Sequence, residues 1–430
     1  MTIAVKNLRW WIVALLAAAT ALNYLDRQSF PVVADEIKKE IPFSTVQYGR
    51  LSSIFLFAYA IMYAGGGWVL DRLGTRAGYA TMIAWWSAAN FLTGLVTSVL
   101  GLGVCRFLLG MGEGGGFPGS SKAVAEWFRP EDRAMAFGIF NTGSAVGAVV
   151  APPLIAFLVV TLGWRSVFFV TGGAGLVCAA VWLKFYQPPA RSPLISAADR
   201  QLLVAALRAG SAAAAPQKIP WLRLFGYGQV RGLMAAKFFS DSSWFFLIFW
   251  LPKYLGESRH LDIRQIGAFA WIPYAFAGVG SFTGGWLNGL LIRRGLTLDR
   301  ARKVTLSLGA LLAPISFFIV EAPLSLALVF FSLAMFAHQF LAPIIMTLVA
   351  DLFPASVVGS VGGLLGSAGA FGGMLFGLLV GWLVETRGYG PAFALAGILE
   401  PMALVVILAS VGRIGPILAL SGRQEQCDCM

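Results

Sequence analysis

The stretch Gly67-Trp-Val-Leu-Asp71-Arg72-Leu-Gly74-Thr-Arg76 is a short charged turn between two long apolar runs, at residues 46–70 and 77–97. Each run is long enough to cross the ~30 Å hydrocarbon core of a bilayer as a helix, which takes about 20 residues. Glycine in such a turn permits tight packing, and the aspartate can pair with a basic residue of a neighbouring loop, such as Arg133. We therefore predict a cytoplasmic gating turn whose charged residues are Asp71, Arg72, Arg76 and Arg133.

The same alternation of apolar runs and polar turns continues along the chain. Hydrophobic types make up 58% of the 430 residues, and only 12% of the residues are charged. So apolar a composition excludes a water-soluble enzyme, because its surface would aggregate. We predict an all-α membrane protein with twelve spanning helices, at about 10–31, 46–70, 77–97, 99–121, 134–159, 165–186, 229–255, 265–292, 302–320, 323–350, 357–383 and 390–412.

One long polar segment divides these spans into six and six. It contains QPPARSP at 187–193 and an AAAAP run at 212–216. We predict an N-terminal six-helix bundle at 1–186, a cytoplasmic linker at 187–228, and a C-terminal six-helix bundle with a short cytoplasmic tail at 229–430.

Three dipeptides of the first half recur in the second at offsets of 218, 223 and 225 residues: Gly67-Trp68 as Gly285-Trp286, Gly143-Ser144 as Gly366-Ser367, and Gly163-Trp164 as Gly388-Tyr389. Near-constant offsets indicate a duplicated six-helix unit and two pseudo-symmetric halves. Duplicated halves in a membrane protein suit alternating access.

The formal net charge of +12 would suggest nucleic acid as a partner for a soluble domain, but here the basic residues cluster between apolar runs. If the N-terminus is cytoplasmic, 20 of the 32 Lys and Arg residues lie in inner segments and eight in outer ones. This bias predicts that both termini are cytoplasmic. The four cysteines, Cys105, Cys178, Cys427 and Cys429, are too scattered for a disulfide framework, and we expect free thiols.

Charged side chains inside the spans are the candidate functional residues, because each costs roughly 2.5–3.5 kcal/mol at a helix centre and should face the bundle interior. Asp26 and Arg27 lie in the first span. Arg106 and Glu113 are seven residues apart in the fourth, which puts them on one helix face about 10 Å apart. Two acids and two bases in two helices exceed what helix packing requires.

Two further pairs of polar residues lie in the second half. Lys237 and Asp241 are four residues apart in one span and within pairing distance. His338 and Gln339 are neighbours in a later span. For each of these charged and polar residues, the alternative is a role in helix packing alone. An ion pair can neutralise both of its charges, and a buried histidine can satisfy the hydrogen bonds of a neighbouring polar group.

A glycine-rich run at residues 110–115 formally matches the G-x-G-x-x-G nucleotide-binding pattern. No strand precedes it and no βαβ unit surrounds it, so this reading fails. Small residues there predict close packing of one helix against its neighbours.

The gating turn, the topology and the repeat together resemble the major facilitator superfamily over the whole chain. Further motifs resemble the anion:cation symporter family of organic-acid carriers: Asn23-Tyr-Leu-Asp-Arg27, Arg106 with Glu113, Phe117-Pro118, Glu126-Trp-Phe128 and Ala151-Pro-Pro153. Four others look most like its hexuronate branch: Lys237-Phe-Phe-Ser-Asp241, Trp250-Leu-Pro-Lys-Tyr254, Ala337-His-Gln339 and Asp351-Leu-Phe-Pro354.

That resemblance implies proton-coupled uptake of a sugar-acid monoanion by rocker-switch motion. It makes Asp26 and Glu113 proton sites, and Arg27 and Arg106 the contacts of the substrate carboxylate. Other substrate-binding residues would be Tyr24, Tyr59, Ser144, Lys237, Asp241, His338, Gln339 and Ser367. Ser144 and Ser367 replace larger polar residues of galactonate carriers, which puts galactonate in doubt.

We accordingly expect a transporter in a bacterial inner membrane that acts as a monomer, with a sugar-acid anion and protons as its partners. No prosthetic group, metal or nucleic acid is expected. Two alternatives stay open: a carrier of another organic anion, such as galactonate or glucarate, and a non-transporting membrane sensor. A membrane-embedded enzyme would need a nucleophile with a base or a metal-ligand cluster, and the sequence shows neither.

Overall fold

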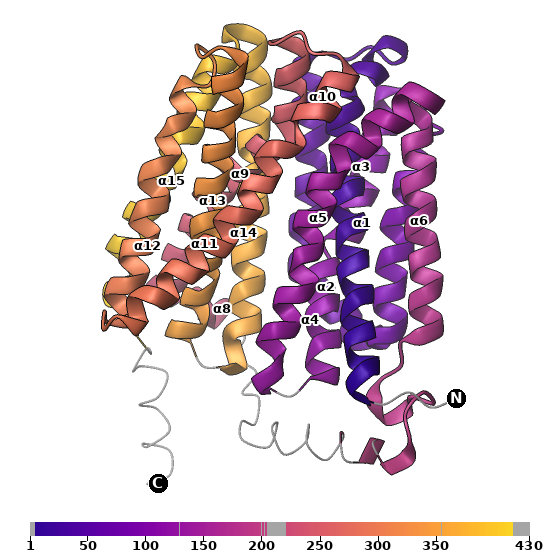
Figure 1. Cartoon of the computed structure of the whole chain (residues 1–430), viewed down its shortest axis with the longest axis vertical. Coiled ribbons are helices and arrows are strands. Elements are labelled where there is room, and N and C mark those ends of the chain that lie inside the picture. Colours follow the sequence, from indigo (N-terminus) through magenta and orange to yellow (C-terminus); the bar gives the residue numbers. More distant parts are fainter. Residues whose placement is uncertain are drawn as a thin grey trace. The chain divides into compact units, whose positions relative to one another are not determined.

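The computed structural model describes residues 5–128, 130–198, 200–201, 203, 221–353 and 355–415, which form helices joined by short turns and contain no strand (Figure 1). The helices are α1 (Val5–Glu40), α2 (Thr45–Thr93), α3 (Val99–Glu113), α4 (Gly116–Trp127), α5 (Pro130–Leu162), α6 (Trp164–Phe185), η1 (Pro189–Arg191), α8 (Trp221–Leu224), α9 (Gly228–Glu257), α10 (Ile263–Phe269), α11 (Trp271–Arg293), α12 (Leu298–Leu312), η2 (Ala313–Phe318), α13 (Leu324–Leu352), α14 (Ala355–Arg387) and α15 (Tyr389–Val411).

Each of the twelve predicted spans coincides with a helix, part of a helix or a pair of short helices. α2 contains two of them: its 49 residues would extend ~74 Å, more than twice the bilayer core, and its backbone leaves the helical region at Gly74 (φ 75°, ψ 159°). The predicted charged turn therefore breaks α2 where expected. Nine of the described helical segments are long and apolar enough to cross a membrane by themselves.

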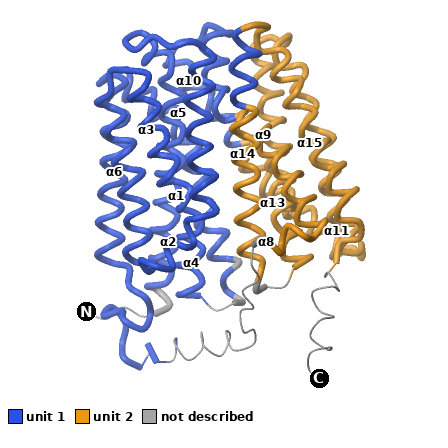
Figure 2. Tube along the Cα trace, turned by 180° about the vertical axis from the view of Figure 1, so that it is seen from behind, with its two compact units in different colours: residues 1–214, 248–275, 377–385 blue, residues 215–247, 276–376, 386–430 orange. Residues whose placement is uncertain are grey.

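The chain forms two compact units, which we describe separately (Figure 2). Unit 1 comprises residues 1–214, 248–275 and 377–385, and unit 2 comprises residues 215–247, 276–376 and 386–430. These units interleave along the sequence, whereas the predicted bundles are contiguous, and the predicted domain boundaries stay a prediction. Residues 199, 202 and 204–220 of the predicted linker, like Cys427 and Cys429, lie outside the described residues. Cys105 and Cys178 are free thiols.

In unit 1 the helices approach closely at small residues. A Cβ on Gly110 would overlap the backbone carbonyl of Phe55, and one on Gly112 would lie 2.7 Å from the backbone nitrogen of Trp86. On α5, Gly143 and Gly147 pack in the same way against the α1 carbonyls of Ala17 and Ala21. The glycine-rich run at 110–115 is thus a helix-packing surface, as the sequence predicted.

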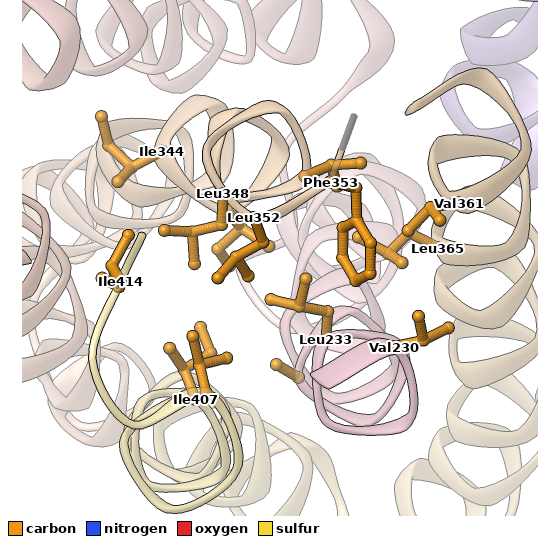
Figure 3. Packing of buried hydrophobic residues seen from close by; sticks show 14 of the residues in the cluster. Val230, Leu233, Ile344, Leu348, Leu352, Phe353, Val361, Leu365, Ile407 and Ile414 are labelled. Carbon is orange, nitrogen blue, oxygen red and sulfur yellow. The ribbon is translucent and has the colours of Figure 1, made fainter. Parts of the chain in front are cut away.

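In unit 2 a buried apolar cluster joins α9, α13, α14 and α15 (Figure 3). Leu233 of α9, Leu348 and Leu352 of α13, Leu365 of α14 and Ile407 of α15 are all at most 2% exposed. Lipid is as apolar as these side chains, so van der Waals packing rather than escape from water holds them together. This cluster fixes the positions of the four helices relative to one another.

The sequence repeat corresponds to a repeated backbone geometry. Gly163 precedes α6 with φ 82°, and its counterpart Gly388 precedes α15 with φ 77°. Only glycine adopts such positive φ angles without strain. The last helix of each half therefore starts from the same kind of turn, which supports the two pseudo-symmetric halves.

Candidate functional site

A cavity of about 200 Å³ lies within unit 1. Its polar lining comes from α1, α2, α3, α4 and α5, and its apolar lining is largely aromatic. The lining includes Thr20, Asn23, Tyr24, Arg27, Tyr59, Tyr63, Glu113, Ser120, Asn141, Trp86, Phe117 and Phe140. Aromatic walls with a few convergent polar groups are typical of small-molecule sites.

A buried ion pair between Arg27 and Glu113 forms the charged centre of this cavity. The Arg27 Nε donates to Glu113 Oε2 at 2.9 Å, and Arg27 Nη2 lies 2.9 Å from the same oxygen. The two side chains are 4% and 0% exposed. Glu113 ends α3, and its Oε1 has no hydrogen-bond partner among the described residues. Part of the carboxylate thus stays available for a proton, water or a ligand.

Aromatic rings and an amide hold Arg27 in place. Its guanidinium carbon lies 4.8 Å from the ring centroids of both Tyr24 and Tyr59, within the range of cation–π attraction. Arg27 Nη2 donates to Asn23 Oδ1, one helical turn earlier on α1, at 3.2 Å. Because these contacts do not involve Glu113, they can keep the guanidinium oriented when Glu113 releases it.

Asp26 is fully buried and is not among the residues that line the cavity. Its Oδ1 accepts from Asn90 Nδ2 of α2 at 2.7 Å, and the same amide nitrogen donates to Thr171 of α6 at 2.7 Å. Asp26 Oδ2 has no hydrogen-bond partner in the described part of the chain. Among the described residues an amide, and no cation, therefore holds this carboxyl group.

Arg106 is buried on α3, 1% exposed, and it is not among the residues that line the cavity. Its guanidinium carbon lies 4.6 Å from the Phe55 ring and 5.0 Å from the Phe30 ring. Its Nε and Nη2 lack hydrogen-bond partners, and no ion pair to it occurs among the described residues. The helical spacing placed Arg106 and Glu113 on one face, yet the partner of Glu113 is Arg27.

Lys237 and Asp241 pair on α9 of unit 2, as their spacing predicted. Lys237 Nζ donates to Asp241 Oδ1 at 2.6 Å, and the side chains are 12% and 10% exposed. The absence of a side chain at Gly369 makes room for the Asp241 carboxylate against α14. Ser367 and Gln339 are half-buried on α14 and α13. The contacts of these residues with a substrate stay predictions.

His338 of α13 pairs with an acid that the sequence interpretation missed. His338 Nδ1 lies 2.6 Å from Glu400 Oε1 of α15, and the side chains are 3% and 1% exposed. The signal was available, since Glu400 is a carboxylate inside the apolar run at 390–412. Asn90, a polar residue within the run at 77–97, was an equally visible signal for the partner of Asp26.

The charged turn of α2 makes contacts that differ in part from those expected. Asp71 Oδ1 accepts from Lys122 Nζ of α4 at 2.6 Å, and does not pair with Arg133. Arg133 instead donates to the carbonyls of Ala125 and Phe128, both at 3.1 Å. Asp71 therefore pairs with a basic residue of α4 rather than with Arg133, whose guanidinium donates to nearby backbone carbonyls.

The other two residues of the turn also have contacts within unit 1. Arg76 donates to the Leu183 carbonyl from Nε and Nη2, at 3.1 and 2.6 Å. The Arg72 guanidinium carbon lies 4.0 Å from the Trp68 ring. Their gating role stays a prediction.

Of the predicted cavity residues in the first half, Tyr24, Tyr59, Arg27 and Glu113 line the cavity. Ser144 does not, and its hydroxyl donates to the Asn141 carbonyl at 2.6 Å. Asn141 itself is in the lining, with Asn23 and Tyr63, and the sequence interpretation assigned none of these three. Which face of α5 meets the cavity depends on its packing against α1, which periodicity alone does not give.

The family model described as Major Facilitator Superfamily matches residues 16–298 of this chain. The chain belongs to this superfamily. Members of the major facilitator superfamily are transporters and not enzymes, so the chain is a multi-pass membrane transport protein rather than a membrane-embedded enzyme.

Several relatives align over most of the length of this chain. The hexuronate transporter of Escherichia coli (strain K12) is 32% identical over 406 residues, 94% of each chain. The "Probable galactarate/D-glucarate transporter GudP" of the same strain is 30% identical, covering 95% of this chain and 94% of its own. The D-galactonate transporter of Escherichia coli O6:H1 is 30% identical, covering 95% and 97%.

A solved bacterial homologue of the human lysosomal transporter Spinster, in an inward-facing and occupied conformation, superposes with a TM-score of 0.67. It is 19% identical and covers 94% of this chain and 95% of its own. This likeness shows the fold.

Proposed function

We propose that this transporter carries a sugar-acid monoanion, a hexuronate such as glucuronate or galacturonate, together with protons by alternating access. We further propose that it does so as a monomer in a bacterial inner membrane with both termini in the cytoplasm. The observation that carries the proposal is the buried Arg27–Glu113 ion pair in the lining of an aromatic cavity. Relatives named for hexuronate, galactarate and galactonate support a sugar acid as substrate.

A charge count links the substrate to the proton. With both acids ionised, Arg27 and Arg106 balance Asp26 and Glu113, so the sum is zero. A bound monoanion makes the sum −1, which is costly in a low-dielectric site, and one proton restores zero. Substrate and proton therefore bind cooperatively.

We assign the exchanged proton to Glu113 because its carboxylate accepts the hydrogen bond that the Arg27 guanidinium could otherwise donate to the substrate. Protonation of the carboxylate weakens the ion pair at 2.9 Å and frees a bidentate donor for the substrate carboxylate. Asp26, which no cation holds in the described residues, is the site for a further proton. If both acids load, each cycle moves one net positive charge inward.

The distribution of unpaired charge favours one carboxylate on the substrate. In unit 2 the Lys237 ammonium group is already paired with the Asp241 carboxylate. In unit 1, Arg106 has no acid at ion-pair distance among the described residues. By the charge count above, a hexuronate monoanion needs one proton to restore the sum to zero, whereas an aldarate dianion needs two.

Uptake of radiolabelled glucuronate and galacturonate into proteoliposomes tests the transport function. We expect accumulation above the external concentration when the outside is acidic, and its collapse with a protonophore. Thermal stabilisation of the purified protein by glucuronate, galacturonate, gluconate, galactonate, glutamate and sialate would rank the substrates. Binding without flux would refute transport and leave a sensor, and stronger stabilisation by a non-uronate would make the protein a carrier of another organic anion.

The predicted orientation has its own test. A cysteine replacing Ser211, which lies outside the described residues, should resist a membrane-impermeant maleimide added to intact cells and react after lysis. Labelling in intact cells would contradict the cytoplasmic linker.

A further inference from the structure

Three helices of unit 2 bring a carboxyl group and an imidazole together in the buried interior. Glu400 of α15 lies 2.6 Å from His338 Nδ1 of α13. Ser240 Oγ of α9 is 3.4 Å from the same nitrogen. The Trp244 ring of α9 stacks on the His338 ring, with centroids 4.8 Å apart and planes inclined by 12°. The proposed coupling of Glu113 to the substrate does not use these groups.

Neighbouring charges in unit 2 do not balance this pair. α9 brings Lys237 and Asp241, which neutralise each other at 2.6 Å. α12 brings Arg302, but its partner is Asp351 of α13, thirteen residues and ~20 Å along that helix from His338. η2, which also packs on α13 and α15, contains no titratable side chain.

Further packing elements likewise bring no charge to the pair. α11 meets α13 through Gly280 and Gly284, which contact the backbone of Phe336 and Phe340. α14 carries no titratable side chain before Glu385. His338 and Glu400 must therefore balance each other.

The pair is neutral with one proton, which leaves an imidazolium beside a carboxylate. Without that proton it carries one negative charge, and with two it carries one positive charge. Glu400 Oε2 is buried and has no hydrogen-bond partner among the described residues, so His338 is the group that compensates the carboxylate. In water the ordinary pKa of imidazole, about 6.5, lies above that of a glutamate carboxyl group, about 4.3, and on this basis we assign the proton to the ring.

We propose that His338 and Glu400 bind one proton as an imidazolium–carboxylate pair, a proton site in unit 2 separate from Asp26 and Glu113. The proton sits on Nδ1 and forms a charge-assisted bond to Oε1 that ties α13 to α15. Loss of this proton leaves one unbalanced negative charge buried on the pair, and the neutral imidazole makes a weaker hydrogen bond to the carboxylate than the imidazolium does. Transport then requires the site to be loaded, which gives the transporter an alkaline limit independent of the substrate.

The chain has two histidines, which makes the protonation state directly measurable. We would record ¹⁵N spectra of histidine-labelled full-length protein in lipid bilayers between pH 5.5 and 9. His260 is exposed in the turn after α9 and serves as the internal reference, assigned by His260→Asn. We expect the His338 ring to give an imidazolium signal at pH 7, separated from the His260 signal by that assignment.

Glu400→Gln should convert the His338 signal to that of a neutral imidazole at pH 7, because the amide cannot balance the charge. Glu321→Gln, which alters an exposed acid of unit 2, should leave the signal unchanged. A neutral His338 ring in the wild type at pH 7, or an unchanged imidazolium in Glu400→Gln, would overturn the site.

Substrate exchange without a gradient provides the functional readout, measured in Glu113→Gln so that the first acid cannot titrate. We expect exchange to fall at least tenfold at the alkaline pH where His338 loses its imidazolium signal. The double variant His338→Gln/Glu400→Gln keeps a neutral polar pair and should exchange without that fall. An identical loss of exchange at alkaline pH in this double variant would overturn the role of the pair in transport. The wild-type spectra test the proton site itself even if Glu400→Gln does not fold.

Discussion

Replacing Glu113 with Gln should separate substrate binding from proton coupling. The amide has the size of the carboxylate but removes the charge that faces Arg27 at 2.9 Å, in a side chain that is 0% exposed. Removing one member of a buried ion pair costs about 3–5 kcal/mol, so the empty variant should unfold at a lower temperature than the wild type. A bound substrate carboxylate replaces the negative charge that the variant lacks. If binding recovers only ~1.4 kcal/mol of the lost stability, the variant binds substrate tenfold more tightly than the wild type does.

The pH dependence of binding should change in a defined direction. In the wild type, binding takes up a proton on Glu113, so affinity should fall as pH rises, by at most tenfold per pH unit for one proton. In Glu113→Gln no proton is needed at this position, and affinity should be nearly constant from pH 6 to 8. Thermal shift or calorimetric titration with glucuronate at three pH values measures both trends.

Transport assays complete this test. Glu113→Gln should retain exchange of labelled for unlabelled substrate across proteoliposomes and lose accumulation driven by a pH gradient. Glu36→Gln is the matched control, because its carboxylate is partly exposed and pairs with Lys39 at 2.7 Å. Gradient-driven accumulation at the wild-type level in Glu113→Gln would refute the assignment of the coupling proton.

Three other outcomes are expected. Arg27→Lys and Arg106→Lys should each weaken substrate binding by roughly ten- to a hundredfold. Lysine lacks the bidentate fork of arginine, and one charge-assisted hydrogen bond is worth about 1.5–3 kcal/mol. Wild-type affinity in both variants would refute the assignment of these two arginines to the substrate carboxylate. Lys237→Met should change the order in which sugar acids stabilise the protein in a thermal-shift panel, and should leave the pH dependence of uptake unchanged. An unchanged order would show that Lys237 serves only in packing. Gly110→Ala should lower the unfolding temperature because its Cβ meets a fixed backbone carbonyl, whereas Gly138→Ala, which meets open space, should not.

The sequence by itself determined the helices, their approximate limits and the superfamily. An apolar run of about 20 residues crosses a bilayer wherever it occurs, and glycine turns at positions such as Gly74 and Gly163 break the chain through local backbone preferences. These are properties of consecutive residues, and periodicity reports them. The same logic identified Asp26, Arg27, Arg106 and Glu113 as functional candidates, because an ionisable residue in a membrane span is costly wherever its neighbours lie.

Only the tertiary structure decided which of these charges meet. Glu113 pairs with Arg27, 86 residues away, and not with Arg106 on its own helix, because the tertiary structure brings α1 and the end of α3 to the same cavity. Asp26 meets Asn90, and His338 meets Glu400 across 62 residues, for the same reason. Helical spacing gives the direction in which a side chain leaves its own helix, but the partner lies on another helix whose rotation and depth depend on every packed neighbour.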